Sequence, residues 1–97
     1  MLICRVTGQA VSTVKHGSLQ GYKLLVCEPL AGLGAPATAP TCLAVDLTGA
    51  GEGDVVAVVT GDPARHAAGV QVPVDAAIVA ILDSVTAQGK TIEGRSR

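Results

Sequence analysis

The sequence is almost without aromatic residues. It contains no tryptophan, no phenylalanine and a single tyrosine, Tyr22. Proteins that bind single-stranded nucleic acid stack its bases on aromatic side chains and carry a basic surface. Here the formal net charge at pH 7 is −1, so a basic surface is missing as well. These two absences argue against nucleic acid as a partner.

Long apolar segments are also missing. The longest runs are VVAVV at 55–59 and AAIVAIL at 76–82, and a membrane helix needs roughly 18–20 apolar residues. The amino-terminal segment meets Arg5 too early for the hydrophobic region of a secretion signal, and no small-residue cleavage site follows. We therefore expect no membrane association and a cytoplasmic location.

The three cysteines do not form a recognisable pattern. Cys4, Cys27 and Cys42 are an odd number, which argues against a disulfide framework. Their wide spacing differs from the close Cys pairs of zinc sites. Because Cys4 and Cys27 lie inside apolar runs, we expect them to pack as small hydrophobic side chains.

Catalytic patterns are missing too. Asp46, Asp75 and Asp83 stand beside apolar runs, but no nucleophile, histidine or metal cluster accompanies them. Surface solvation or capping is the better interpretation, and Asp75 is placed to cap a turn that follows it. His16 and His66 are expected on the surface. The sequence therefore predicts a protein that is not an enzyme, with no catalytic residue, no metal site and no cofactor.

Aliphatic residues are what the chain has in excess. Of its 97 residues, 48% are hydrophobic, and the mean hydropathy is +0.48. Another protein surface is the natural place for apolar side chains that neither a membrane nor a small core takes up. The composition favours an oligomer, although a tightly packed monomer stays open.

Short apolar segments separated by glycine and proline predict a small barrel. Gly8 inside the first segment indicates a bulge or a sharp bend, and Asp62-Pro63 is a good start for a short helix that ends near Gly69. A further helical turn is an option at 73–77. Residues 78–85 fit either a helix or a strand, and the strand is favoured. The expected strands are 2–14, 22–28, 41–47, 54–60 and 78–85. The predicted fold is mainly β, an OB-like five-stranded barrel with one short helix.

The carboxyl-terminal residues 89–97 are polar and are expected to be frayed. The sequence IEGR at 92–95 matches a protease site often added to recombinant proteins. It is either a remnant of cloning or native. We therefore divide the chain into a barrel domain over 1–88 and a flexible tail over 89–97.

The glycine-rich segment GAGEG at 49–53 invites comparison with phosphate-binding loops. Those loops lead into a long helix and carry a lysine, whereas here a β segment follows and no lysine is near. On composition alone, a tight hairpin turn supplied by glycine is the simpler interpretation.

Several segments together resemble a family of shell proteins. They are, in chain order, RVTGQAVST (5–13), LQGYKLL (19–25), EPL (28–30), AVD (44–46), GAGEG (49–53), GDPAR (61–65) and PVDAAIVAILD (73–83). In this order they resemble the vertex proteins of carboxysomes and of ethanolamine- and propanediol-type microcompartments. The family usually has a small hydroxyl pair where Asp62-Pro63 stands, and often glycine at Ala80.

The resemblance implies a structural role. Members of this family are cyclic homopentamers that cap the five-fold vertices of a bacterial microcompartment, a cytoplasmic shell otherwise built of hexameric tiles. The expected partners are therefore further copies of this chain and hexameric shell proteins. The alternative is a small OB-like module that binds a ligand or peptide without catalysis; it lacks the basic groove or aromatic platform that would support it.

Two places carry the functional hypotheses. The first is the loop of Gly49, Ala50, Gly51, Glu52 and Gly53. Five copies of a loop can meet closely at an axis when its side chains are small, and Glu52 would then add a ring of acid that disfavours anions. A hairpin turn without any transport role is the open alternative.

The second place is the turn at 61–65. We expect Gly61, Asp62 and Arg65 to form the outer rim, with Arg65 donating hydrogen bonds to the edge of a hexamer.

Overall fold

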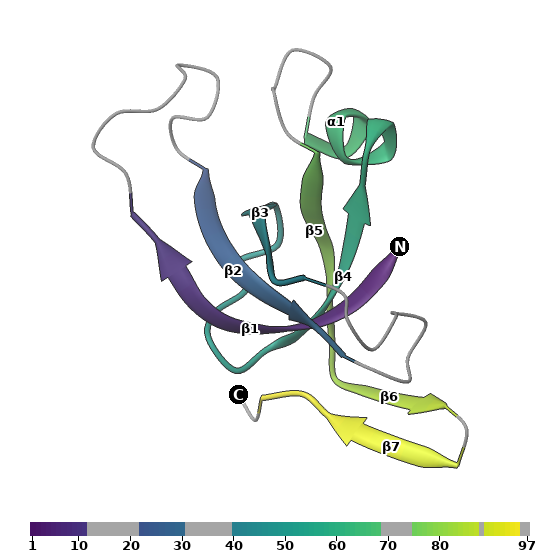
Figure 1. Ribbon diagram of the computed structural model, residues 1–97. Helices are drawn as coiled ribbons and strands as arrows, with labels where there is room; N and C mark the ends of the chain where they lie inside the picture. Colours follow the sequence, from purple (N-terminus) through teal and green to yellow (C-terminus); the bar gives the residue numbers. More distant parts are fainter. Residues whose placement is uncertain (12–21, 31–39, 69–74, 88, 96–97) are drawn as a thin grey trace.

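Five strands close into a barrel, drawn in Figure 1. The computed structural model describes residues 1–11, 22–30, 40–68, 75–87 and 89–95, without the side chains of Asp62 and Arg65. The barrel strands are β1 (Leu2–Ala10), β2 (Lys23–Pro29), β3 (Cys42–Asp46), β4 (Val55–Thr60) and β5 (Ala76–Leu82). Their order around the barrel is β1-β2-β3-β5-β4, and β4 pairs again with β1. Neighbouring strands are antiparallel, except that β3 and β5 are parallel.

The prediction of a mainly β, five-stranded barrel with one short helix is confirmed. A closed ring of strands leaves no open sheet edge. Side chains alternate between the interior and the outside along a strand. In β1, for example, Cys4 and Val6 are buried while Thr7 is exposed. Leu25 and Ile78 are the largest fully buried side chains of the described residues, because the sequence has no tryptophan or phenylalanine to fill the barrel.

The bulge expected at Gly8 is present. The pairing of β1 with β2 shifts between Val6 and Gly8, so the strand gains one residue relative to its partner. A bulge bends a strand more sharply, and a small barrel needs such a bend in order to close.

One helix, α1 (Asp62–Ala68), covers an end of the barrel. It begins at the predicted residue and packs Ala64 and Ala68 against Val45 and Ala77. None of the helices in the described ranges is long and apolar enough to cross a membrane.

The helical turn expected at 73–77 is wrong for its described part. Residues 73 and 74 lie outside the described residues, and Ala76 and Ala77 belong to β5. They pair there with Thr60 and Val59 of β4, and this pairing outweighs any local preference for a turn. Asp75 caps no turn; its backbone carbonyl accepts a hydrogen bond from the Gly61 N–H at 2.8 Å.

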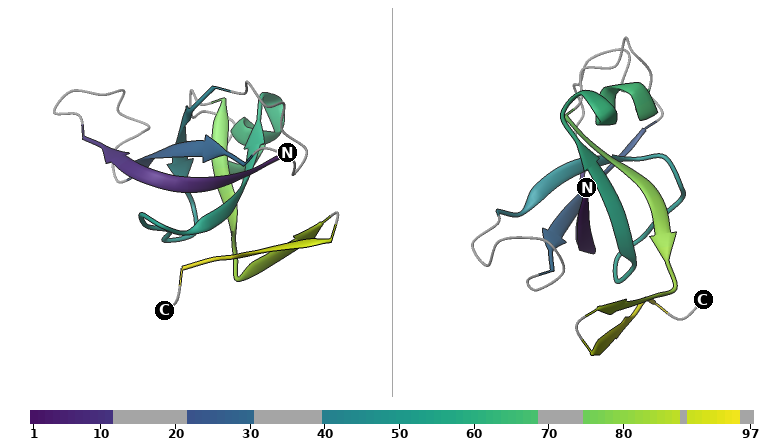
Figure 2. Two further views of the ribbon diagram at one scale, coloured as in Figure 1. Left: turned by 60° about the horizontal axis from the view of Figure 1, so that its bottom comes forward. Right: turned by 90° about the vertical axis from the view of Figure 1, so that its right-hand side faces the viewer.

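The segment after the barrel forms a second, two-stranded sheet. Strands β6 (Ser84–Ala87) and β7 (Lys90–Glu93) pair as an antiparallel hairpin, which Figure 2 shows standing away from the barrel. The predicted strand at 78–85 is therefore divided at Asp83. Fraying was expected from residue 89, but residues 90–93 form β7 because this segment pairs with β6. The domain boundary after residue 88 stays a prediction, and it falls inside the hairpin.

Candidate functional site

The glycine loop at 49–53 joins β3 to β4, and it is not the tight hairpin turn that composition suggested. Strands β3 and β4 do not pair with each other, since β5 lies between them. The loop therefore crosses one end of the barrel. Two of its glycines have positive φ, 82° at Gly49 and 92° at Gly53, a conformation that residues with a side chain rarely adopt. Ala50 is buried in the barrel core, whereas Glu52 is exposed.

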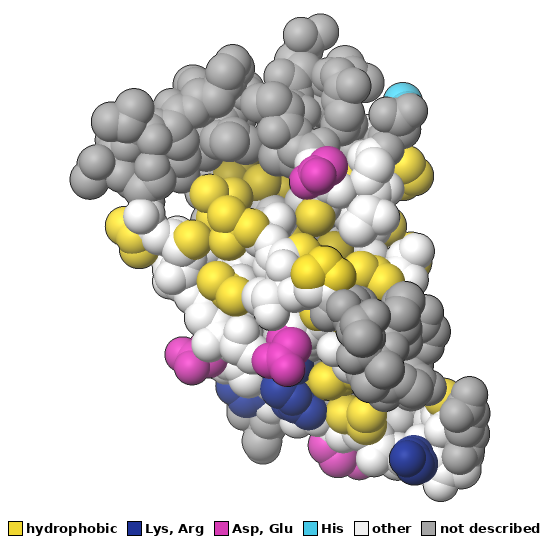
Figure 3. Space-filling view, viewed as in Figure 1, with side chains coloured by type: hydrophobic (Ala, Val, Ile, Leu, Met, Phe, Trp, Pro, Cys, Tyr) yellow, Lys and Arg dark blue, Asp and Glu magenta, His cyan; other side chains and the backbone are white. Residues whose placement is uncertain are grey.

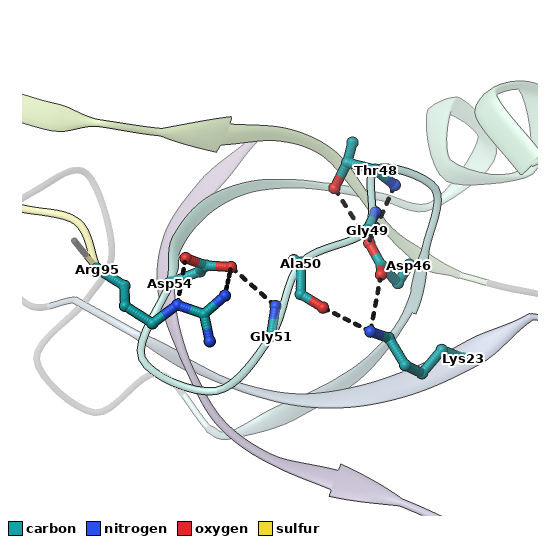
Figure 4. A network of polar contacts seen from close by, with 8 residues as sticks. All are labelled: Lys23, Asp46, Thr48, Gly49, Ala50, Gly51, Asp54 and Arg95. Atoms are coloured by element: carbon teal, nitrogen blue, oxygen red, sulfur yellow. Dashed lines mark hydrogen bonds and ion pairs between the residues drawn. The ribbon is translucent and has the colours of Figure 1, made fainter. Parts of the chain in front are cut away.

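Asp46 fixes the first half of the loop. One of its carboxylate oxygens accepts hydrogen bonds from the Thr48 N–H (3.0 Å), the Thr48 hydroxyl (3.1 Å) and the Gly49 N–H (3.2 Å). Burial raises the pKa of Asp46, but the backbone N–H groups of Thr48 and Ala50, the Thr48 hydroxyl and the Lys23 charge outweigh it and hold the pKa below its usual value. Lys23 Nζ lies 3.6 Å from the other oxygen and donates to the Ala50 carbonyl at 2.6 Å. Figure 4 shows Lys23 between these two acceptors.

Asp54 fixes the second half. Its side chain is only 1% exposed, and one of its oxygens accepts a hydrogen bond from the Gly51 N–H at 2.8 Å. Arg95 reaches the same carboxylate from beyond β7, with Nε at 3.3 Å and Nη2 at 3.4 Å. Its Nη1 donates to the Glu52 carbonyl at 3.0 Å. The buried carboxylate therefore ties the loop to the carboxyl-terminal segment (Figure 4).

Strand β1 holds the same loop from another side. Arg5 Nη1 donates to the Gly53 carbonyl at 2.9 Å, and its Nη2 donates to the Glu93 carbonyl at 3.3 Å. The Gly53 N–H donates to the Val6 carbonyl, and the Val6 N–H to the Asp54 carbonyl, both at 2.9 Å. Three cationic side chains thus contact backbone carbonyls of one short loop. Such a loop has little freedom to rearrange.

The turn predicted as a shell contact lies at the opposite end of β4. Gly61 has a φ of 70°, and its carbonyl accepts a hydrogen bond from the Ala64 N–H at 3.1 Å. Asp62 and Arg65 lie on α1, and their side chains are outside the described residues. A strand of this length separates its ends by roughly 20 Å. The two predicted sites are therefore on opposite ends of the barrel and do not form a single site.

The remaining carboxylates and histidines do not gather into a reactive centre in the described part of the chain. Across those residues, the structure contains no group of three histidine, cysteine or carboxylate side chains that could hold a metal ion. Asp83 and His66 are exposed. His16 lies outside the described residues. Asp46 and Asp54 act on the backbone of the loop, which is a structural use of a carboxylate.

The cysteines, which looked scattered, are neighbours in the barrel. Cys27 lies directly opposite Cys42 in the pairing of β2 with β3, and Cys42 packs against the core cluster that contains both Cys4 and Cys27. All three are free thiols. Burial, together with the nearby Cys42, raises the pKa of Cys4 and of Cys27 to about 12, and burial also raises the pKa of Cys42.

We expect the free energy of unfolding to fall as the pH rises above about 9. In the unfolded chain the thiols of Cys4 and Cys27 have their ordinary pKa of 9.0, whereas in the folded chain the pKa of each is raised to about 12. Between these values the unfolded state binds fewer protons, so alkaline pH favours it; below 9.0 the stabilisation is complete. Urea denaturation in reducing buffer at about pH 8 and about pH 10 measures the difference. The variant Cys4→Ala/Cys27→Ala should lose less stability between the two pH values. An equal loss of stability in the variant and the wild type would show that these two thiols do not cause the pH dependence.

The comparisons with known proteins agree with one another. A model of the family described as "Ethanolamine utilisation protein EutN/carboxysome" matches residues 1–83. The shell vertex protein EutN of Salmonella typhimurium is 40% identical over 93 residues, which span 95% of this chain and 93% of the relative. The carboxysome shell vertex protein CcmL of Synechococcus elongatus is 41% identical over 93 residues, with the same two shares.

Solved structures give the same result. The pentameric microcompartment shell protein GrpN from Rhodospirillum rubrum superposes with a TM-score of 0.74 at 42% identity, over 90% of this chain and 98% of that one. A structure of the ethanolamine utilization protein EutN gives a TM-score of 0.85 at 37% identity, over 99% of this chain and all of the other. The match to EutN therefore includes the carboxyl-terminal hairpin.

Proposed function

Because the chain belongs to the family described as ethanolamine utilisation protein EutN/carboxysome, we propose that it is a structural vertex protein of a bacterial microcompartment shell. Five copies form a ring, and the ring closes a five-fold corner of the shell. The observation that carries the proposal is the likeness to GrpN, a pentameric shell protein that this chain matches at 42% identity over nearly all of its length. The role is structural and not catalytic, as the names of the relatives support.

The need for such a ring follows from geometry. Flat hexagonal tiles make a flat sheet, and a closed polyhedron needs five-fold units at its corners. A ring forms when each copy contacts the next by the same head-to-tail interface and the rotation closes. Apolar residues on the outside of the described chain support an interface of this kind. Met1 is 80% exposed, Val11 86% and Leu43 48%.

We place the glycine loop at 49–53 at the five-fold axis. Its fixed backbone and its lack of bulky side chains suit a close approach of five copies, with Glu52 as the one exposed charge. The turn of Gly61, Asp62 and Arg65 then lies toward the outer rim, where it meets hexameric shell proteins. Its position at the other end of β4 supports that separation. A structure of the ring with the glycine loop on its outside would overturn both placements.

We expect the native mass to be five times the chain mass of 9.6 kDa. Native mass spectrometry and sedimentation at micromolar concentration measure it. A head-to-tail interface that closes at five gives one species and no ladder of open oligomers. A stable monomer, or a ring of six, would contradict the proposed function.

A further inference from the structure

The hairpin of β6 and β7 has one apolar face. Strand alternation puts Val85, Ala87 and Ile92 on the same side, and Val85 is directly opposite Ile92 in the pairing. Lys90 lies on this side at the tip of the hairpin and is exposed. The other face is polar, and its four side chains are exposed: Ser84, Thr86, Thr91 and Glu93. An amphipathic pattern of this kind is typical of a sheet that packs one face on another surface.

In the single subunit Val85, Ala87 and Ile92 are only partly covered, each being intermediate between buried and exposed. Neither of the two apolar clusters of the barrel includes a residue of the hairpin. The barrel contacts that the structure shows lie at the base, through Arg5, Asp54 and Arg95. A two-stranded hairpin is marginally stable in water without further packing. The part of its apolar face that stays exposed is therefore available to a partner.

The base of the hairpin is nevertheless fixed in direction. The Gly94 N–H donates to the Asp83 carbonyl at 2.8 Å, so the first and last residues of the hairpin stay together. A Cβ at Gly94 would overlap the Leu82 carbonyl, so the chain passes the end of β5 closely. Arg95 then binds Asp54 on the barrel. The hairpin is thus held at one end and projects away from the barrel, as both views in Figure 2 show.

We propose that the apolar face of this hairpin packs against the barrel of the neighbouring copy in the ring. This inference rests on the proposed function. In a head-to-tail ring each copy offers one hairpin and receives one, so that the exposed part of every apolar face is covered. A receiving surface is available, because apolar side chains gather over the barrel in Figure 3 and Leu43 of β3 is 48% exposed. The strands of the hairpin extend roughly 13 Å, far enough to cross an interface.

The variant Val85→Thr/Ile92→Thr tests the proposal. Threonine keeps the preference for a strand but replaces apolar groups with hydroxyls. The control is Thr86→Ser/Thr91→Ser on the opposite face, which retains both hydroxyls of the 3.0 Å hydrogen bond between these side chains. Sedimentation and native mass spectrometry over a dilution series give the concentration at which half of the chains are in rings. We expect that concentration to rise at least about tenfold for the first variant and to stay unchanged for the control.

The outcomes separate the two proposals. Rings that form at the same concentration in both variants as in the wild type would overturn the hairpin contact alone. A wild-type chain that stays monomeric would overturn the proposed function and the contact with it.

Hydrogen exchange on the wild type gives a second test that needs no variant. Backbone amides of β6 and β7 should be protected in the ring and exchange at least about tenfold faster after dilution to monomer. Equal exchange in both states would overturn the proposal. Protection that appears only when other shell proteins are added would do the same, because it would assign the hairpin to a different partner.

Discussion

We expect Asp54→Ala to lower the free energy of unfolding by about 2 kcal/mol. The Asp54 side chain is 1% exposed and accepts hydrogen bonds from the Gly51 N–H and from Arg95. The substitution leaves that N–H without its carboxylate and releases Arg95 from the loop. Hydrogen bonds to a charged group contribute about 1.5–3 kcal/mol each when they are buried. The Arg95 side chain is 41% exposed, so we discount its share. Urea denaturation followed by circular dichroism measures the change.

Glu52→Ala is the matched control. Glu52 is an acid of the same loop, but its side chain is exposed, and Arg95 binds its backbone carbonyl, which the substitution retains. We expect a change below about 0.5 kcal/mol. Hydrogen exchange should also quicken in β7 of Asp54→Ala and not in the control. Equal stability of the two variants would show that the buried carboxylate does not tie the loop to the hairpin.

The barrel was predictable from the sequence because its signals are local. Runs rich in valine and isoleucine mark the strands, and glycine or proline interrupts them. Asp62-Pro63 likewise marks the start of α1, which begins at Asp62. The core needed no special pattern, since most of its residues are apolar residues of these strands.

The contact between Arg95 and Asp54 was not predictable, because it joins residues 41 positions apart. Nothing near Arg95 in the sequence indicates a buried carboxylate. Local composition instead suggested a frayed segment from residue 89 onward. The alternation of Thr91, Ile92 and Glu93 was a signal for β7, although it is short. Glycine 94 was a second signal, since a glycine next to a strand often marks a close backbone approach.

The cysteines are a second case in which the sequence does not reveal which distant residues become neighbours. Cys4, Cys27 and Cys42 are far apart in the sequence, but they lie on the three consecutive barrel strands β1, β2 and β3. Only the register of the strands places Cys27 opposite Cys42. The glycine loop was misread for a related reason. Sequence order made β3 and β4 appear to be a hairpin, whereas β5 returns from the end of the chain and lies between them.

Leu25→Ala should lower the free energy of unfolding by about 3 kcal/mol. Leu25 is 2% exposed and is among the largest side chains in the barrel. The substitution removes buried methyl groups and leaves a cavity, and the cost depends on how far the surroundings can collapse. Here β2 is hydrogen-bonded to β1 on one side and to β3 on the other, within a closed ring. The strands cannot move inward without breaking the ring, so the cavity stays open. Urea denaturation of the diluted chain measures the loss.

Leu43→Ala separates this effect from the assembly of the ring. Leu43 is on the adjacent strand β3, and it is 48% exposed in the single subunit. In a dilute sample of monomers its removal should cost less than about 0.5 kcal/mol. At concentrations where rings form, the cost should grow, because a contact made only in the ring stabilises the folded chain by mass action. The cost of Leu25→Ala should be the same at both concentrations, since that side chain is covered by its own barrel. A loss for Leu43→Ala that does not depend on concentration would remove Leu43 from the interface between copies.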